Sequence, residues 1–143
     1  MIASITRFRN EYAWLSNFYR SPMVIDSQYY PTVEHYFQSM KASNANDAIT
    51  IRNASSPAES KRLGKIVTLR PDWAQIKDQV MEHGLRCKFS NFVMRCLLLS
   101  TGSAELVEGN YHNDTYWGYC LKTKQGQNVL GRLLMKIRSE IQI

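Results

Sequence analysis

A series of helix start signals from residue 32 onward is the feature that most narrows the folds open to this chain. Four capping residues each stand just ahead of, or at the start of, a segment with helical periodicity: Thr32, Asn46, Ser56 and Asp72. Together with the periodicity of the later segments, these signals predict helices over 32–43, 46–53, 57–65, 73–89, 91–100 and 128–142. The sequence therefore predicts a mostly helical protein.

The remaining segments are rich in aromatic and β-branched residues with turn formers among them, a composition typical of short strands and loops. Near the N-terminus we expect strands at Ile5–Phe8, Met23–Ile25 and Gln28–Tyr30. Between residues 104 and 127 we expect irregular chain with one or two short strands, and such a long irregular stretch is often functional. The expected fold is of the α+β class, with few strands. A length of 143 residues fits a single compact domain spanning 1–143.

Charge and composition narrow the choice of partner. The formal net charge of +6 favours an anionic partner such as a nucleotide, a phosphosugar or a nucleic acid, although many soluble domains are simply basic. No run of five basic residues occurs, which argues against a basic tail that wraps DNA but is compatible with a small phosphate pocket. No apolar run reaches about 18 residues, so we expect no membrane span.

The cysteines and histidines give two further expectations. Three cysteines without CxxC spacing, and an N-terminus without an apolar signal segment, favour free thiols in a reducing cytoplasm. The histidines, His35, His83 and His112, show no spacing typical of metal ligands. We therefore expect no metal site.

The segment YPTVEHYFQSMK, residues 30–41, places charges beside an apolar face. On a helical wheel the apolar arc consists of Val33, Tyr36, Phe37 and Met40. Glu34 and Lys41 fall together on one flank of this arc, whereas His35 points toward the expected solvent side. The two flanking charges have two interpretations, a functional pair or a structural ion pair at the edge of a helix.

Two other segments combine polar and aromatic residues. Trp73 begins a predicted helix, where it either caps a core or offers a surface on which a base or sugar stacks. Lys88 lies within the apolar arc of the same helix, so it either extends toward solvent or lines a cavity. The stretch NYHNDTYWGYC, residues 110–120, ends near QGQNVLG, which predicts a turn and then a helix capped by Asn128.

Six segments together resemble one family. They are SNFY (16–19), YPTVEHYFQSMK (30–41), SSPAESKRLGK (55–65), RPDWAQIKDQVMEHGLRCKF (70–89), LLLSTGSAELVEGNYHNDTYWG (97–118) and NVLGRLLMKIR (128–138). Their combination and order, over nearly the whole chain, are similar to the YbiA-like, or NADAR, family. One segment differs, because members often carry a more glycine-rich stretch where this chain has YCLKTKQGQN.

The resemblance implies an N-glycosidase, a hydrolase acting on ribosylated bases such as riboflavin-pathway intermediates or ADP-ribosylated guanine. By motif position, the catalytic residues it implies are Glu34, Trp73 and Asp114. Residues expected to bind substrate are Asn17, Phe18, Lys41, Lys88, Trp117, Gly118 and Asn128. Lys41 either binds phosphate or attacks the ribose as an amine, and Lys88 is a second candidate for phosphate.

The chemistry of the N-glycosidic bond fits two carboxylates and an aromatic wall, because the transition state resembles an oxocarbenium ion. We expect Glu34 to stabilise this cation and activate water, with Asp114 binding ribose hydroxyls or sharing acid–base work, and no cofactor. The expected partner is a small phosphorylated riboside or ADP-ribosyl compound, with at most weak nucleic-acid contact. The alternative function is a non-catalytic module that binds ADP-ribose or NAD.

Overall fold

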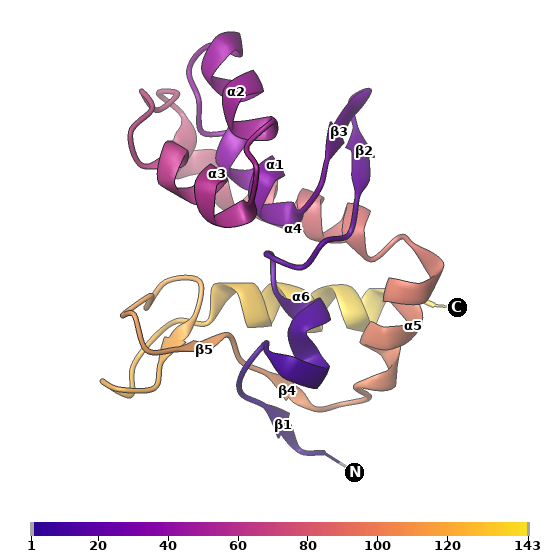
Figure 1. The fold of residues 1–143 in the computed structure, drawn as a ribbon. Helices are drawn as coiled ribbons and strands as arrows, with labels where there is room; N and C mark the ends of the chain where they lie inside the picture. The colour runs from indigo at the N-terminus through magenta and orange to yellow at the C-terminus, as the bar shows by residue number, and fades with distance from the viewer. Residues whose placement is uncertain (1, 143) are drawn as a thin grey trace. The chain divides into compact units, whose positions relative to one another are not determined.

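The computed structural model describes residues 2–142 (Figure 1). The chain divides into two units. Unit 1 combines residues 2–16 with residues 89–142, and unit 2 is the continuous segment 17–88. Met1 and Ile143, which the expected domain 1–143 includes, lie outside the described residues.

Unit 2 begins with a hairpin and continues as a group of helices. The strands β2 (Met23–Ile25) and β3 (Gln28–Tyr30) pair antiparallel, and both residues of the connecting turn have positive φ, as tight hairpin turns require. The helices are α1 (Val33–Ser39), α2 (Ala45–Arg52), α3 (Pro57–Gly64) and α4 (Trp73–Lys88). α1 packs against each of the other three, and Figure 1 shows α2 and α3 beside it.

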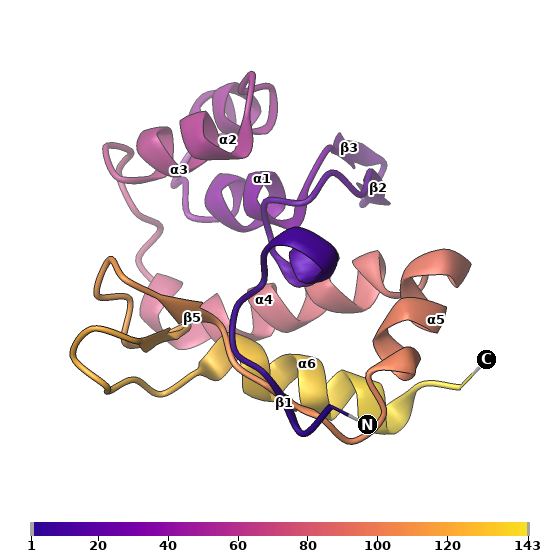
Figure 2. The same cartoon turned by 60° about the horizontal axis from the view of Figure 1, so that its bottom comes forward.

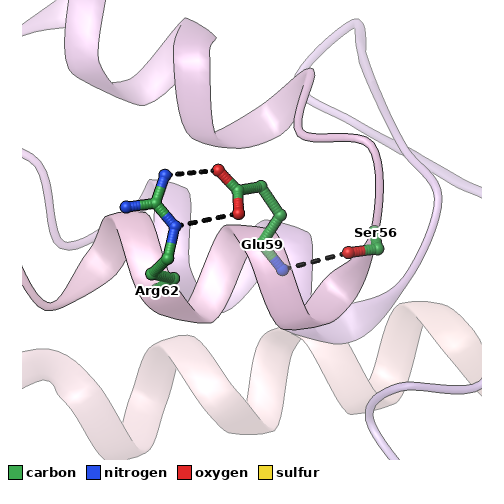
Figure 3. A network of polar contacts seen from close by, with 3 residues as sticks. All are labelled: Ser56, Glu59 and Arg62. Carbon is green, nitrogen blue, oxygen red and sulfur yellow. Dashed lines mark hydrogen bonds and ion pairs between the residues drawn. The ribbon is translucent and has the colours of Figure 1, made fainter.

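The start of α3 shows how local sequence fixes a helix end (Figure 3). The Ser56 hydroxyl accepts a hydrogen bond from the backbone N–H of Glu59 at 3.0 Å, and Pro57 occupies the first turn. One turn further, the Arg62 guanidinium pairs with the Glu59 carboxylate. These contacts place the beginning of α3 at the residue that the sequence predicts.

Unit 1 is built from two segments, one near each end of the sequence (Figure 2). Its elements are β1 (Ser4–Ile5), the 3-10 helix η1 (Asn10–Leu15), α5 (Phe92–Ser100), β4 (Glu105–Leu106), β5 (Gly109–Asn110), β6 (Tyr119–Cys120) and α6 (Val129–Glu140). β1 pairs in parallel with β4, so that Ile5 lies opposite Leu106, and β5 pairs in parallel with β6. α6 packs against β4 and buries an apolar stripe of Leu130, Leu134 and Ile137.

The expected α+β fold is confirmed, with most of the regular structure helical and short strands near the N-terminus and between residues 104 and 127. Several local predictions were wrong. Helix α2 is capped by Asn44 and not by Asn46, and three short strands, where one or two were expected, lie between residues 104 and 127. The strand expected at Ile5–Phe8 is only Ser4–Ile5, and residues 10–15, expected as loop, form η1. Within residues 2–142, no helix combines the length and the apolar character needed to cross a membrane.

Candidate active site

Helix α1 is buried along its whole length, which is why polar side chains on it lie inside unit 2. Thr32 caps the helix, its hydroxyl accepting a hydrogen bond from the backbone N–H of His35 at 3.1 Å. All seven residues from Val33 to Ser39 are buried, because α2, α3 and α4 all pack against this helix. A polar side chain in such a helix needs a partner inside the protein.

The prediction that His35 points toward solvent was therefore wrong. Its side chain is 2% exposed, and Nε2 donates to the backbone carbonyl of Ala54 at 3.0 Å. Since a carbonyl only accepts, Nε2 carries a proton, and in the neutral ring Nδ1 accepts from the Thr32 hydroxyl at 2.8 Å. Burial lowers the pKa of His35, so the neutral ring is favoured. His35 ties the start of α1 to the chain between α2 and α3.

Glu34 is the buried carboxylate of this helix. It is 7% exposed, and its Oε2 accepts a hydrogen bond from the side-chain amide of Gln38, one turn later, at 2.8 Å. Its own backbone N–H donates to the carbonyl of Asn17 at 3.1 Å. The first helical turn also favours a negative charge, because it lies at the positive end of the helix dipole. The buried helix therefore fixes the position of the carboxylate, and the Gln38 amide fixes one of its oxygens.

Lys41 lies just beyond the end of α1, with its Nζ 5.6 Å from the centre of the Phe37 ring. The same ring packs against Trp73, with centroids 5.1 Å apart and planes tilted by 58°. Burial lowers the pKa of Lys41, the negative charge of Glu34 acts in the opposite direction, and the lysines Lys61, Lys65 and Lys77 add to the lowering. Glu34, Lys41 and Trp73 therefore belong to one neighbourhood in unit 2.

Three other predicted residues also belong to unit 2. Lys88 is fully buried at the end of α4, its Nζ lies 5.7 Å from the centre of the Tyr19 ring, and burial lowers its pKa to about 7. Asn17 is buried and its Nδ2 donates to the sulfur of Met81 at 3.4 Å, whereas no described residue donates to its Oδ1. Phe18 is partly exposed.

Asp114 lies in unit 1, in the loop between β5 and β6. Its Oδ1 accepts hydrogen bonds from the backbone N–H groups of Tyr116 and Trp117 at 3.2 and 3.0 Å, an arrangement typical of an Asx turn. Asn110 holds the same loop from inside: its Oδ1 accepts from the Asp114 N–H at 3.1 Å and its Nδ2 donates to the Asp114 carbonyl at 3.0 Å. The carboxylate is fixed by backbone contacts.

Gly118 and Asn128 are both tightly packed in unit 1. A Cβ atom on Gly118 would collide with the backbone carbonyl oxygen of Glu108, which cannot move aside as a side chain can, so only glycine fits there. The Asn128 amide donates to the carbonyl of Leu106 at 2.9 Å and accepts from the N–H of Glu108 at 2.9 Å. Asn128 precedes α6 as predicted, but its side chain makes no capping bond to that helix. Binding of substrate by these residues remains a prediction.

Two buried amides, Gln38 and Asn110, were not among the predicted site residues, although each directly contacts a predicted acid. The signal for Gln38 was its position four residues after Glu34, one helical turn away. A cavity of about 570 Å³ opens in unit 2 beside the end of α1, but none of the predicted site residues lines it. Among residues 2–142, no three His, Cys, Asp or Glu side chains are grouped so that they could hold a metal ion.

Comparison with known proteins identifies relatives over nearly the whole chain. A family model described as the NADAR domain matches residues 6–142. The chain is 41% identical over 137 residues to the N-glycosidase YbiA of Escherichia coli, covering 94% of this chain and 84% of that protein. It is 40% identical over 136 residues to an N-glycosidase of Nostoc punctiforme, covering 91% and 86% respectively.

A riboflavin biosynthesis protein of Zea mays, PYRR, is 40% identical over 125 residues, which are 78% of this chain and 20% of that protein. Among solved structures, the NMR structure of Escherichia coli YbiA matches with a TM-score of 0.86 at 39% identity. That match covers 98% of this chain and 86% of the other chain.

Proposed function

Because this chain belongs to the NADAR domain family, we propose that it is an N-glycosidase, a hydrolase that cleaves the bond between ribose and base in a phosphorylated riboside. The riboside is of the riboflavin-intermediate or ADP-ribosylated guanine type, the first being supported by the similarity to PYRR. The observation that carries the proposal is the buried Glu34 carboxylate, with Lys41 and Trp73 in its neighbourhood.

The reaction makes defined demands on the protein. The bond between C1′ and the base nitrogen breaks with its electron pair going to the base, and water supplies an oxygen to C1′. One proton of that water passes to a general base of the protein, and the nitrogen of the departing nucleobase gains a proton. Glu34 stabilises the positive charge on the ribose and accepts the proton from water. Trp73, which packs against Phe37, offers an aromatic surface to the base or sugar. The role of Asp114, binding ribose hydroxyls or sharing the acid–base work, is assigned by motif position alone.

A phosphate on the substrate agrees with the charges around Lys41. Three further lysines, Lys61, Lys65 and Lys77, act electrostatically on its amine, so positive charge is concentrated in this part of unit 2. A bound phosphate would neutralise this repulsion. The unsatisfied Oδ1 of Asn17 would accept a hydrogen bond from a ribose hydroxyl. Phosphate and hydroxyl recognition by these groups would orient C1′ toward Glu34.

The test is a panel of N-ribosides incubated with the wild type and with Glu34→Gln, followed by mass spectrometry for free base. We expect base release by the wild type and a loss of at least about 10²-fold in Glu34→Gln, with the fold unchanged. Glu105→Gln, on an exposed residue of β4, is the matched control and should keep full activity. Near-wild-type turnover by Glu34→Gln would contradict the assignment.

Lys41 offers a covalent variant of the mechanism. Burial lowers the pKa of its amine, which increases the fraction that is unprotonated and nucleophilic at neutral pH. In this variant the amine attacks C1′ of the ribose and displaces the base, which leaves with the bonding electron pair and a proton. The resulting ribosylamine opens its sugar ring to form an imine, and water later hydrolyses the imine to release the sugar. Borohydride added during turnover would reduce the imine to a stable adduct at Lys41. The absence of an adduct would favour direct attack by water and leave Lys41 as a phosphate ligand.

The alternative function, a module that holds ADP-ribose or NAD without hydrolysis, uses the same cationic neighbourhood. Calorimetric titration distinguishes the two functions when it is combined with the product assay. Binding with no base released from any riboside would favour the binding module. Weak binding to DNA that disappears as salt increases would indicate that charge assists a substrate held in nucleic acid.

A further inference from the structure

Gln38 connects the Glu34 carboxylate to a glycine on a neighbouring helix, Gly64. We propose that Gln38 is a positioning residue for Glu34, and that residue 64 is glycine because the Gln38 amide occupies the space of a side chain there. The inference rests on the proposed function, since it requires that Glu34 take part in catalysis. Neither residue was assigned a role by motif position.

The contact between Gln38 and Glu34 is buried on both sides. Gln38 is 4% exposed, and its Nε2 donates to Glu34 Oε2 at 2.8 Å. A carboxylate only accepts hydrogen bonds, so the amide must present its nitrogen to Glu34; the reverse orientation would bring two oxygens together. The Glu34 charge therefore determines which way the amide faces.

The other end of the amide faces α3. Within residues 2–142, Oε1 of Gln38 is buried and has no hydrogen-bond donor. A Cβ atom on Gly64 would collide with this oxygen and would lie 2.9 Å from Cδ of the same side chain. The amide is thus clamped between the Glu34 carboxylate and the backbone of Gly64.

The backbone of Gly64 does not itself require glycine. The residue is the last one of helix α3 and has no positive φ, so any amino acid is compatible with its conformation. Alanine forms helices more readily than glycine. Glycine is therefore required at this position because the Gln38 amide occupies the volume that a Cβ atom would need.

This arrangement leaves Glu34 with little freedom to rotate away from a bound sugar. If Gln38 lost its amide, the carboxylate would keep its charge and its place on α1, but its oxygen would no longer be held. A displacement of about 1 Å at a reacting group lowers rate by about 10²-fold. Substrate binding, which depends on other groups, should change much less.

The test measures kcat, KM and thermal stability for Gln38→Met, which keeps the length of the side chain and removes the hydrogen bond. We expect kcat to fall by about 10- to 100-fold with KM changed by less than about 3-fold. If Gln38→Met does not fold, Gln38→Asn withdraws the amide by one methylene and tests the same contact. A variant with lowered thermal stability but unchanged kcat would overturn the proposal, because the contact would then be structural only.

Gly64→Ala provides an independent test through a double-mutant cycle with Gln38→Ala. Because Gly64 acts through the amide, Gly64→Ala should lower kcat in the wild-type background and have almost no effect on kcat once Gln38 is alanine. The control is Gly84→Ala on α4, whose Cβ would crowd Tyr36 instead of Gln38; its effect should be equal in both backgrounds. Equal effects of Gly64→Ala in the two backgrounds would overturn the role given to Gly64.

Glu34→Gln separates this proposal from the proposed function. An active Glu34→Gln enzyme would remove the catalytic role of Glu34 and with it the reason to position that residue. An inactive Glu34→Gln enzyme together with a fully active Gln38→Met enzyme would leave the function intact and overturn the role of Gln38 alone.

Discussion

The two units hold their predicted catalytic acids in different ways. In unit 2, Glu34 lies on a buried helix and one of its oxygens is held by a side chain, Gln38. In unit 1, Asp114 lies in a loop, and one of its oxygens is held by two backbone N–H groups. A contact with a side chain can be removed by one substitution without changing the backbone, whereas backbone contacts are part of the loop itself. Helix α1 therefore determines the position of Glu34, whereas Asp114 itself stabilises the loop in which it lies.

The largest expected difference concerns activity. Glu34→Gln should lower kcat by at least about 10²-fold. Asp114→Asn should lower it less, because the amide oxygen can still accept from both N–H groups and preserve the turn, and ribose binding tolerates a neutral group. Steady-state kinetics on a substrate cleaved by the wild type would measure both. A greater loss in Asp114→Asn than in Glu34→Gln would place the principal acid in unit 1 and reverse the comparison.

The next effect concerns stability and tests whether the loop of unit 1 depends on one buried amide. Asn110→Ala removes bonds to the N–H and carbonyl of Asp114 and to the N–H of His112. At about 1 kcal/mol for each bond, the free energy of unfolding should fall by about 2–3 kcal/mol, measured by urea denaturation. The neighbouring exposed residue supplies the control, since His112→Ala leaves these bonds in place. Equal stabilities of the two variants would show that the loop does not depend on Asn110.

A smaller effect, dependent on pH, is expected from unit 2. Burial lowers the pKa of His35 and outweighs the hydrogen bond to Ala54, which raises it, while the charge of Arg20 adds to the lowering. The unfolded chain therefore binds a proton more readily than the folded protein. The free energy of unfolding should be constant above pH 6.5, the ordinary histidine value, and fall as pH decreases from there toward the lowered pKa.

The measurement for this prediction is urea denaturation between pH 5 and 8 on the wild type and on His35→Gln. The variant should lose most of the dependence on pH between about 5 and 6.5. His112→Gln, at an exposed histidine in unit 1, should retain it. If His35→Gln follows the wild-type profile, another group causes the loss of stability in acid.

The smallest expected effect is that of a chelator. Protein groups and water are sufficient for the proposed hydrolysis, so EDTA should leave kcat unchanged in the wild type. Activity that disappears with EDTA and returns with added metal would contradict the proposed roles of both acids.

The sequence was most informative where structure is determined locally. Ser56 and Pro57 mark the start of α3, and Thr32 caps α1, as predicted. The helix of residues 10–15 was missed because it has no capping signal: Arg9 precedes it without a side-chain cap, and Asn10 has positive φ. The parallel pairing of Ile5 with Leu106 joins residues about a hundred positions apart, and no local pattern indicates such a pair.

The candidate site could be predicted only in part, because local patterns identify residues on one helix but not contacts between helices. Motif position selected Glu34, and the helical wheel put Lys41 on the same flank. The wheel was wrong for His35 because it assumes one face toward water, whereas three helices surround α1. Gln38 lies one helical turn after Glu34, which the sequence shows, but its contact with Gly64 could not be predicted, because a close approach between two helices leaves no periodic signal.

The pairing of β1 with β4 has a consequence for the order in which the chain can fold during synthesis. Ile5 leaves the ribosome early, but its partner Leu106 emerges only after all of unit 2 has been made. Unit 2 is continuous, so its helices can assemble while the first strand still waits for a partner. A substitution that disturbs Ser4 or Ile5 would therefore act late, on the closing step of unit 1, and would spare the helices already formed.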